Sequence, residues 1–205
     1  MKTMTVEQLY EKLCSKAFQD PRNGDLHYNY FMFQYDATKE YDMLRQIDDI
    51  REKIRRPNNN VDILLLNLFE EFTAFLDARS FGRKWNSYKD YLIHKEQTMP
   101  NEVQKSLGDL ANSDEFIDYL HKRIMKHVEK VDDNMIRPYV FVYGVGAMFP
   151  YLRVNNLLVR YEAPNNSSAY KLIIFYPGEQ YENTYKLFGK LEDYHTYRAS
   201  LLLNE

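Results

Sequence analysis

Four short runs of almost uninterrupted apolar residues constrain the fold of this chain more than any other feature. They are Tyr28 to Tyr35, Val61 to Leu66, Tyr139 to Tyr143 and Lys171 to Tyr176. Each run is rich in aromatic or β-branched residues and is shorter than a typical helix, which favours strands. Strands without polar alternation are typical of parallel sheets, because helices cover both faces of such sheets. The runs therefore predict four buried strands.

The segments between these runs have apolar residues at helical spacing. Thr5 to Ala17 is expected to be a helix, and Thr5 with Gln8 matches a capping box. Asn67 is expected to cap the helix that follows the second run. Further helices are expected at about 37 to 56, 77 to 97 and 150 to 160, and at 100 to 131 as one long helix or two.

This order of elements predicts the fold class. Strands that alternate with helices favour parallel pairing and right-handed crossovers. We therefore expect an α/β fold, a Rossmann-like three-layer sandwich with a mostly parallel sheet of four to five strands and extra helices. The fifth strand is a short edge strand at Tyr197 to Leu203. No linker long enough to separate domains is present, so residues 1–205 are expected to form a single domain.

The single cysteine and the modest net charge limit the expected location and ligands of the chain. One thiol, Cys14, cannot form an internal disulfide, and the first residues lack a signal-peptide core, so a cytoplasmic location is expected. The longest apolar run is too short to cross a membrane. A nucleic-acid-binding protein usually carries an excess of basic residues, whereas this chain has a formal net charge of −3. Direct binding to nucleic acid is therefore not expected. The basic residues that alternate with acids, and read as a solvated helix face, are Arg51, Lys53, Arg55 and Arg56.

Aromatic residues are unusually frequent, with 18 Tyr and 12 Phe. The phenylalanines are expected to fill the core. Tyrosine rings either fill the core or form a surface that binds protein, since tyrosine is amphipathic and loses little entropy when ordered. For tyrosine both interpretations stay open.

Gly144-Val145-Gly146 lies between a predicted strand and a predicted helix, where dinucleotide-binding folds hold a phosphate. Phe149 stands in the place of the third glycine of that motif, and Pro150 has no N–H donor. We therefore favour a tight turn after a buried strand. A nucleotide-binding protein or a degenerate NTPase that uses this turn is the alternative.

Three charged residues fall near the carboxyl ends of the predicted strands: Asp36, Arg153 and Glu179. Asp36 is expected to cap a helix or stabilise a turn, with a metal ligand as the alternative. Arg153, expected one turn into its helix, pairs with Glu179 or Asp36, or else holds an anionic ligand. We favour the internal pair, which would still line a functional crevice.

The sequence contains no catalytic motif that we recognise. The 5 histidines match no zinc spacing, and Cys14 lies on a predicted buried stripe, where a thiol is inert. No Gly-x-Ser-x-Gly motif is present. A loose group, read as solvated loop charges, comprises Glu179, Glu182, Glu192, Asp193 and His195. We therefore expect no enzyme activity, no metal and no cofactor.

The last third of the chain contains several motifs in a fixed order. A strand, a Gly-Val-Gly turn and a Pro-x-x-Arg segment run from Val140 to Arg153. An apolar strand closed by Tyr-Pro-Gly-Glu runs from Leu172 to Glu179. The remaining motifs are Asn155-Asn156-Leu157-Leu158, Leu187-Phe188-Gly189-Lys190-Leu191 and Tyr197-Arg198-Ala199. In these motifs the chain resembles the BrxB family of bacteriophage-exclusion (BREX) defence systems.

The resemblance implies a component of a BREX phage-defence system. Such proteins act beside a large ATPase, an adenine methyltransferase and an alkaline-phosphatase-like PglZ protein. An adaptor or scaffold role is implied, with other BREX proteins as partners and the PglZ-like protein as the direct one. The family brings no catalytic residues. The residues expected to form a functional crevice or partner-binding surface are Asp36, Gly144, Gly146, Pro150, Arg153, Pro177, Gly178, Glu179 and Arg198.

Overall fold

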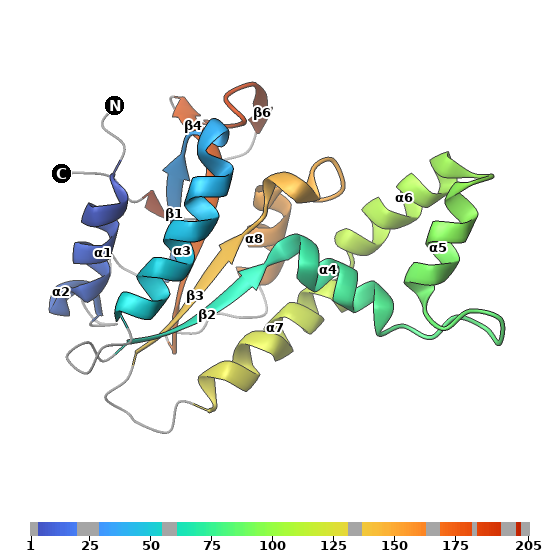
Figure 1. The fold of residues 1–205 in the computed structure, drawn as a ribbon, viewed down its shortest axis with the longest axis horizontal. Coiled ribbons are helices and arrows are strands. Elements are labelled where there is room, and N and C mark those ends of the chain that lie inside the picture. Colours follow the sequence, from blue (N-terminus) through green and yellow to red (C-terminus); the bar gives the residue numbers. More distant parts are fainter. Residues whose placement is uncertain are drawn as a thin grey trace.

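The fold is taken from a computed structural model, which describes residues 4–19, 29–54, 61–130, 137–162, 169–181, 184–193 and 200–201. A sheet flanked by helices forms the body of the molecule, and further helices project from it as an arm (Figure 1). In this described part of the chain, no helix combines the length and the apolarity needed to cross a membrane. The α/β class expected from the sequence is confirmed.

Five strands pair in parallel, in the spatial order β2-β3-β4-β1-β7. Three of the predicted runs lie within β2, β3 and β4, and β1 covers the first run from Tyr30 onward, Tyr28 being outside the described residues. β7 lies within the predicted edge strand. The bounds are Tyr30–Tyr35 for β1, Val61–Asn67 for β2, Arg137–Tyr143 for β3, Lys171–Tyr181 for β4 and Ser200–Leu201 for β7.

Two more strands, β5 (Thr184–Leu187) and β6 (Leu191–Asp193), make the sheet mixed. β4 pairs with β1 as far as Pro177, and from Gly178 onward it pairs with β5 in antiparallel register. The expected four- to five-stranded, mostly parallel sheet of a Rossmann-like sandwich is therefore not confirmed. The prediction failed because Pro177-Gly178 does not end the fourth strand. Proline cannot donate to a ladder and glycine admits a close neighbour, so this pair marks a change of partner.

One face of the sheet is covered by the N-terminal helices α1 (Val6–Cys14), α2 (Lys16–Gln19) and α3 (Glu40–Ile54). Their apolar residues pack against strand residues such as Phe33, Phe141 and Phe175. The predicted capping box is confirmed: the Gln8 N–H donates to Thr5 Oγ1, and the Thr5 N–H donates to Gln8 Oε1.

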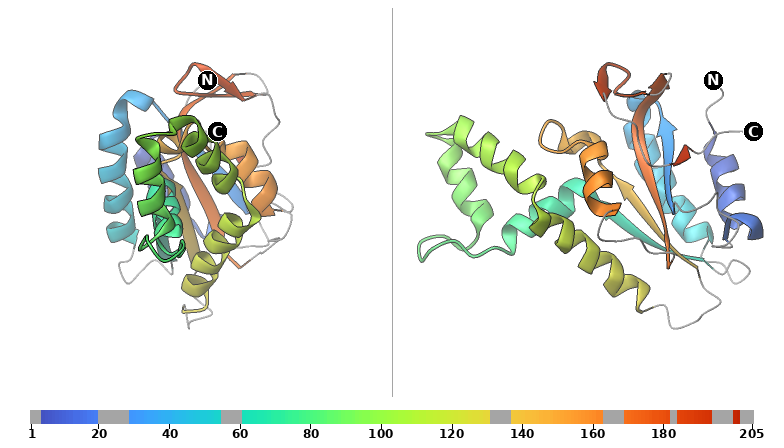
Figure 2. Two further views of the ribbon diagram at one scale, coloured as in Figure 1. Left: turned by 90° about the vertical axis from the view of Figure 1, so that its right-hand side faces the viewer. Right: turned by 180° about the vertical axis from the view of Figure 1, so that it is seen from behind.

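The other face is covered by α4 (Leu68–Asp77), α7 (Asp114–Val128) and α8 (Val154–Glu162). Strand residues that alternate with the first set, such as Met32, Val140 and Ile174, point into this second core. Figure 2 shows α3 and α8 on opposite sides of the strands. Both faces are thus buried, which explains why the central strands read as continuous apolar runs.

The arm belongs to the long connection between β2 and β3. α4 leads out, α5 (Tyr88–Glu96) and α6 (Pro100–Ala111) lie at the far end, and α7 returns (Figures 1 and 2). The segment after Pro100 forms two helices rather than one, because Ser113 caps α7 by accepting the Phe116 N–H at 3.2 Å. The rings of Phe72, Phe75, Phe116 and Tyr119 pack α4 against α7.

Candidate functional site

The carboxyl ends of the parallel strands bring several predicted site residues to one edge of the sheet. Asp36 follows β1, Gly144 follows β3, and Gly178 lies where β4 leaves the parallel sheet. Tyr35 and Pro177 are register partners, so the ends of β1 and β4 are adjacent. In open α/β sheets this edge is where ligands and partners usually bind.

A hollow of about 400 Å³ lies at this edge. It unites Asp36, Gly178 and Glu179, which the sequence had placed at strand ends. It also includes residues that sequence reasoning did not single out for this site: Tyr35, Ala37, Thr38, Phe188 and Gly189. The lining of the hollow therefore includes two acidic residues, Asp36 and Glu179, and two aromatic residues, Tyr35 and Phe188.

Asp36 is held by its own turn. Its Oδ1 accepts the Thr38 backbone N–H at 2.9 Å and the Thr38 hydroxyl at 2.8 Å, which caps the 3-10 turn η1 (Ala37–Lys39). These bonds, the backbone one first, hold the pKa of the exposed Asp36 carboxyl below its ordinary value. The predicted capping role is confirmed, and the carboxylate stays charged at neutral pH.

Tyr35 also lines the hollow, next to Asp36 in the chain. It is buried, and its hydroxyl donates to Glu40 Oε2 at the start of α3. Burial, followed by this hydrogen bond to a carboxylate, raises the pKa of Tyr35 far above its ordinary value. The hydroxyl therefore stays protonated and acts as a fixed donor that joins β1 to α3.

The glycines of this edge are used for internal packing. A Cβ on Gly178 would lie 2.2 Å from the Lys186 carbonyl oxygen, so glycine is required where β5 approaches β4. A Cβ on Gly146 would lie 2.8 Å from Cε1 of Phe188, and one on Gly144 (φ +70°) would lie 2.5 Å from Asn67 Oδ1. The favoured interpretation of Gly144-Val145-Gly146 as a tight turn has a physical basis here, since Phe188 and Asn67 already occupy the space beside its glycines.

Phe188 is the prominent side chain of the site. It has φ +57°, a left-handed conformation that is rare for a residue with a large side chain, and Gly189 follows with φ +68°. Its backbone N–H donates to the Pro177 carbonyl oxygen at 2.8 Å. The ring covers Gly146 on one side, and the residue as a whole remains 37% exposed. The turn between β5 and β6 thus presents an aromatic ring above the carboxyl edge.

Pro150 and Arg153 lie in a loop rather than in a helix, which corrects the sequence prediction. Phe149 is extended (φ −69°, ψ 136°), and α8 begins only at Val154. The physical reason is that the residue before a proline disfavours helical backbone. The Arg153 guanidinium carbon lies 4.7 Å from the centroid of the Phe149 ring. The predicted ion pair with Glu179 or Asp36 stays a prediction, and Arg198 lies outside the described residues.

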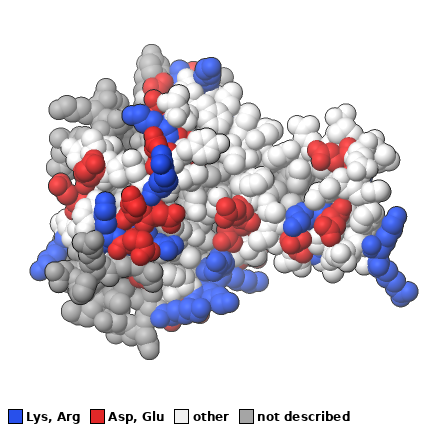
Figure 3. Space-filling model, viewed as in Figure 1, with Lys and Arg blue, Asp and Glu red and all other residues white. Residues whose placement is uncertain are grey.

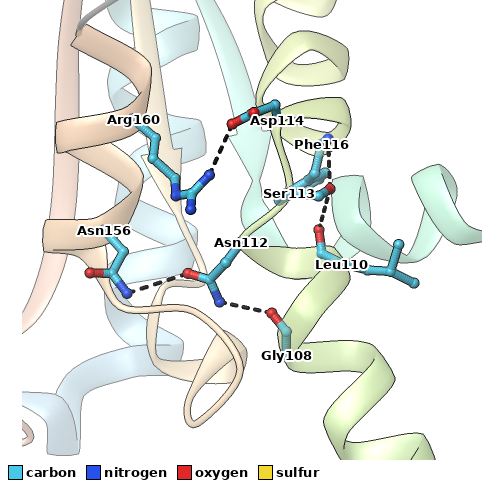
Figure 4. A network of polar contacts seen from close by, with 8 residues as sticks. All are labelled: Gly108, Leu110, Asn112, Ser113, Asp114, Phe116, Asn156 and Arg160. Atoms are coloured by element: carbon cyan, nitrogen blue, oxygen red, sulfur yellow. Dashed lines mark hydrogen bonds and ion pairs between the residues drawn. The ribbon is translucent and has the colours of Figure 1, made fainter.

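A polar network fixes this loop and α8 to the base of the arm (Figure 4). Asn112 Nδ2 donates to the Tyr151 carbonyl oxygen and to the Gly108 carbonyl oxygen, both at 2.8 Å. Asn156 Nδ2 donates to Asn112 Oδ1 at 3.3 Å, and Arg160 pairs with Asp114 at 2.9 Å. These bonds join the loop after β3 and helix α8 to the base of the arm.

Among the residues that the structure describes, Asp36 and Glu179 are the acidic residues that line the hollow. Among the residues that the structure describes, no three His, Cys, Asp or Glu side chains lie close enough to share a metal ion. Glu192 pairs with Lys186 at 3.0 Å, whereas Glu182 and His195 lie outside the described residues. Cys14 is partly rather than fully buried, and burial raises the pKa of its thiol. What the edge provides is a surface with an exposed ring and two carboxylates, which suits binding.

Comparisons with known proteins agree with the motifs of the last third and extend beyond them. The family model described as "BREX protein BrxB" matches residues 64–202, which is more than half of the chain. A BREX protein BrxB from Bacillus cereus (strain H3081.97) is 22% identical over 206 residues, covering 98% of this chain and 96% of the relative. No solved structure matches this chain significantly.

Proposed function

Because this chain belongs to the BrxB family of BREX proteins, we propose that it serves phage defence as a non-catalytic adaptor or scaffold. We propose the PglZ-like protein of the system as its direct partner and the cytoplasm as its place of action. Membership of the family supports the role in BREX defence. The adaptor role and the partner are our own inference.

One observation supports this proposal: the motif residues of the last third pack so that an aromatic ring is exposed at the carboxyl edge of the sheet. Gly146, Pro177 and Gly178 pack so that Phe188 stands exposed beside the hollow of Asp36 and Glu179. Exposed aromatic rings with a polar surround are typical of protein interfaces. The side chains at this edge support contact with a partner better than they support a reaction.

Co-purification tests the proposal. The tagged full-length chain is co-expressed with the other BREX proteins, and the captured partner is quantified for Glu179→Lys, which reverses an exposed charge of the hollow. We expect capture of the PglZ-like protein to fall about tenfold, because charges at an interface affect association strongly. The matched control is Glu7→Lys on the exposed side of α1. A wild-type chain that captures no BREX protein at micromolar concentrations contradicts the proposal.

The nucleotide-binding alternative predicts a different result. A nucleotide that binds the Gly144-Val145-Gly146 turn stabilises the folded chain by about 2.7 kcal/mol when present at one hundred times its dissociation constant. The unfolding temperature rises as a result. We expect no shift with ATP, GTP or NAD, because Phe188 and Asn67 fill the space beside the glycines. A clear shift that Gly146→Ala removes would favour the alternative.

A further inference from the structure

The arm ends in a structured surface that the candidate site does not involve. We call residues 79–97 the arm tip; it comprises the loop after α4 together with α5. The loop doubles back through an antiparallel bridge between Phe81 and Trp85, and the Tyr88 N–H donates to the Arg79 carbonyl oxygen at 2.7 Å. Figures 1 and 2 show this region at the end of the molecule away from the sheet.

Aromatic rings of the arm tip pack on one another; Phe81 is exposed, whereas Trp85, Tyr88 and Tyr91 are partly buried. Phe81 stacks on Tyr91 with ring centroids 4.1 Å apart, and Trp85 lies 4.7 Å from His94. Within the fully described helix α5, Leu92 is the one buried residue. Phe81 and Ile93 are 37% and 58% exposed. Tyr88 and Tyr91 pack against the core, so Phe81 stands at the outer edge of a ring cluster, an arrangement typical of surfaces that contact other proteins.

The charge of the arm tip is opposite to that of the whole chain. Residues 79–97 contain five Lys or Arg and two acidic residues, whereas the chain has a formal net charge of −3. Arg83 and Lys84 form no ion pair with the described residues, and Lys84 Nζ lies 5.0 Å from the centroid of the Trp85 ring. Figure 3 shows basic side chains reaching outward at this end. The basic residues that do have partners pair as Arg79 with Glu115, Lys89 with Asp77 and Lys95 with Glu102.

We propose that the arm tip is a docking surface for an acidic segment of a partner protein. Apolar side chains of that segment pack on Phe81 and its neighbouring rings, and its carboxylates meet Arg83 and Lys84. The inference rests on the proposed adaptor function and adds to it a second contact surface of opposite charge. An adaptor with an acidic hollow and a basic tip can hold two partners, or one partner at two places.

A nucleic acid fits this tip less well than an acidic protein segment does. Binding to a phosphate backbone draws its affinity from several basic contacts, and two cations without an ion pair supply few. The exposed apolar surfaces of Phe81 and Ile93 also have no use in contact with phosphate. Both features suit a protein segment that combines carboxylates with apolar residues.

Charge reversal at the tip tests the proposal with the full chain. In Arg83→Glu with Lys84→Glu, we expect capture of the tip's BREX partner to fall about tenfold or more, and to fall also in the wild type as salt is raised. The matched control, Lys122→Glu with Lys126→Glu, makes the same charge change on exposed residues of α7 and is expected to capture normally. Thermal unfolding verifies that both variants are folded.

A second readout needs no BREX partner. Trp85 is the one tryptophan of the chain, so its fluorescence reports directly on the tip. A short synthetic peptide of alternating Glu and Leu is expected to shift this fluorescence in the wild type and in the α7 control. The shift is expected to be lost in the tip variant.

The outcomes separate this inference from the proposed function. Equal capture by the tip variant and the wild type overturns the inference and leaves the adaptor role standing. A wild type that captures no BREX protein contradicts the adaptor role, and the inference falls with it unless Trp85 responds to the peptide in the manner expected. Two further outcomes overturn the proposal of an acidic segment. If the wild type binds a DNA duplex and the tip variant does not, the tip binds nucleic acid. If light scattering shows a dimer of the wild type and a monomer of the tip variant, the tip binds a second copy of the chain.

Discussion

The sheet body and the arm tip use aromatic rings in opposite ways. In the body, Phe141 and Phe175 are fully buried, with ring centroids 5.0 Å apart between the central strands and the helices above them. At the tip, Phe81 and Tyr91 stack at a shorter distance, yet Phe81 stays 37% exposed. Rings in the body gain free energy from removal of apolar surface from water, which the tip rings achieve only in part. The same residue type thus stabilises the body and remains free for a partner at the tip.

The largest expected effect compares one ring from each region. Phe141→Ala leaves a cavity in the fully buried core and is expected to lower the free energy of unfolding by about 3–5 kcal/mol. Phe81→Ala is expected to cost about 1 kcal/mol or less, since its ring is already partly hydrated. Urea unfolding measures both. Equal losses would remove the distinction between the two regions.

A smaller effect is expected where the body turns into the site. Gly178→Ala places a Cβ 2.2 Å from the Lys186 carbonyl oxygen, so β4 and β5 must separate, at a cost of about 2 kcal/mol. The matched control is Gly108→Ala in α6, where a Cβ meets nothing within 4 Å. It is expected to stabilise the chain by about 0.5–1 kcal/mol. A tolerated Gly178→Ala, by the same unfolding measurement, would contradict the packing described at this edge.

The junction between body and arm predicts a third, more modest change. Ser113→Ala removes the cap of α7 and is expected to cost about 1 kcal/mol. Ser106→Ala, inside α6, makes the same substitution without loss of a cap and is expected to stay within about 0.5 kcal/mol of the wild type. If the two variants unfold alike in urea, the Ser113 cap does not stabilise the start of α7.

The smallest expected change in stability concerns a buried tyrosine of the body, Tyr185, and it is measured at alkaline pH. Burial raises the pKa of Tyr185 from 10.0 to about 12. A raised folded-state pKa means that the unfolded state loses its proton first, so the contribution to stability is complete below pH 10 and declines as pH rises toward 12. Unfolding measured between these values is expected to show a shallower decline for Tyr185→Phe than for the wild type. An identical decline would assign the alkaline loss to other groups.

The sequence predicts best those strands whose residues are apolar on both faces of the sheet. β1, β3 and β4 were found because strands inside a covered sheet lack polar alternation, and β2 was found because its run is equally apolar although it lies at the edge. β5 was missed because its signal is short: Tyr185 and Leu187 are buried, and Lys186 between them is not. The start of α8 was placed too early, since the helical pattern outweighed the effect of Pro150 on its neighbour.

The charged residues of the candidate site could be predicted from the sequence, but the position of Phe188 could not. Asp36 and Glu179 were associated because carboxyl ends of parallel strands meet at one edge, and they do line one hollow. Phe188 belonged to a recognised motif, yet nothing in the residue type indicates a left-handed φ of +57°. Its position follows from the antiparallel hairpin of β5 and β6, which is set by tertiary pairing rather than by local propensity.

The placement of the arm between β2 and β3 makes it modular. A parallel pair always needs a crossover, and here β2 and β3 pair in register from Val61 opposite Arg137 to Asn67 opposite Tyr143 across a connection that contains the whole arm. α4 and α7 form a stem against the sheet, so the segment beyond them is an insertion that can lengthen, shorten or be exchanged without disturbing the strands. Relatives are therefore free to diverge at this tip, and a transplanted tip offers a route to change partner specificity within one scaffold.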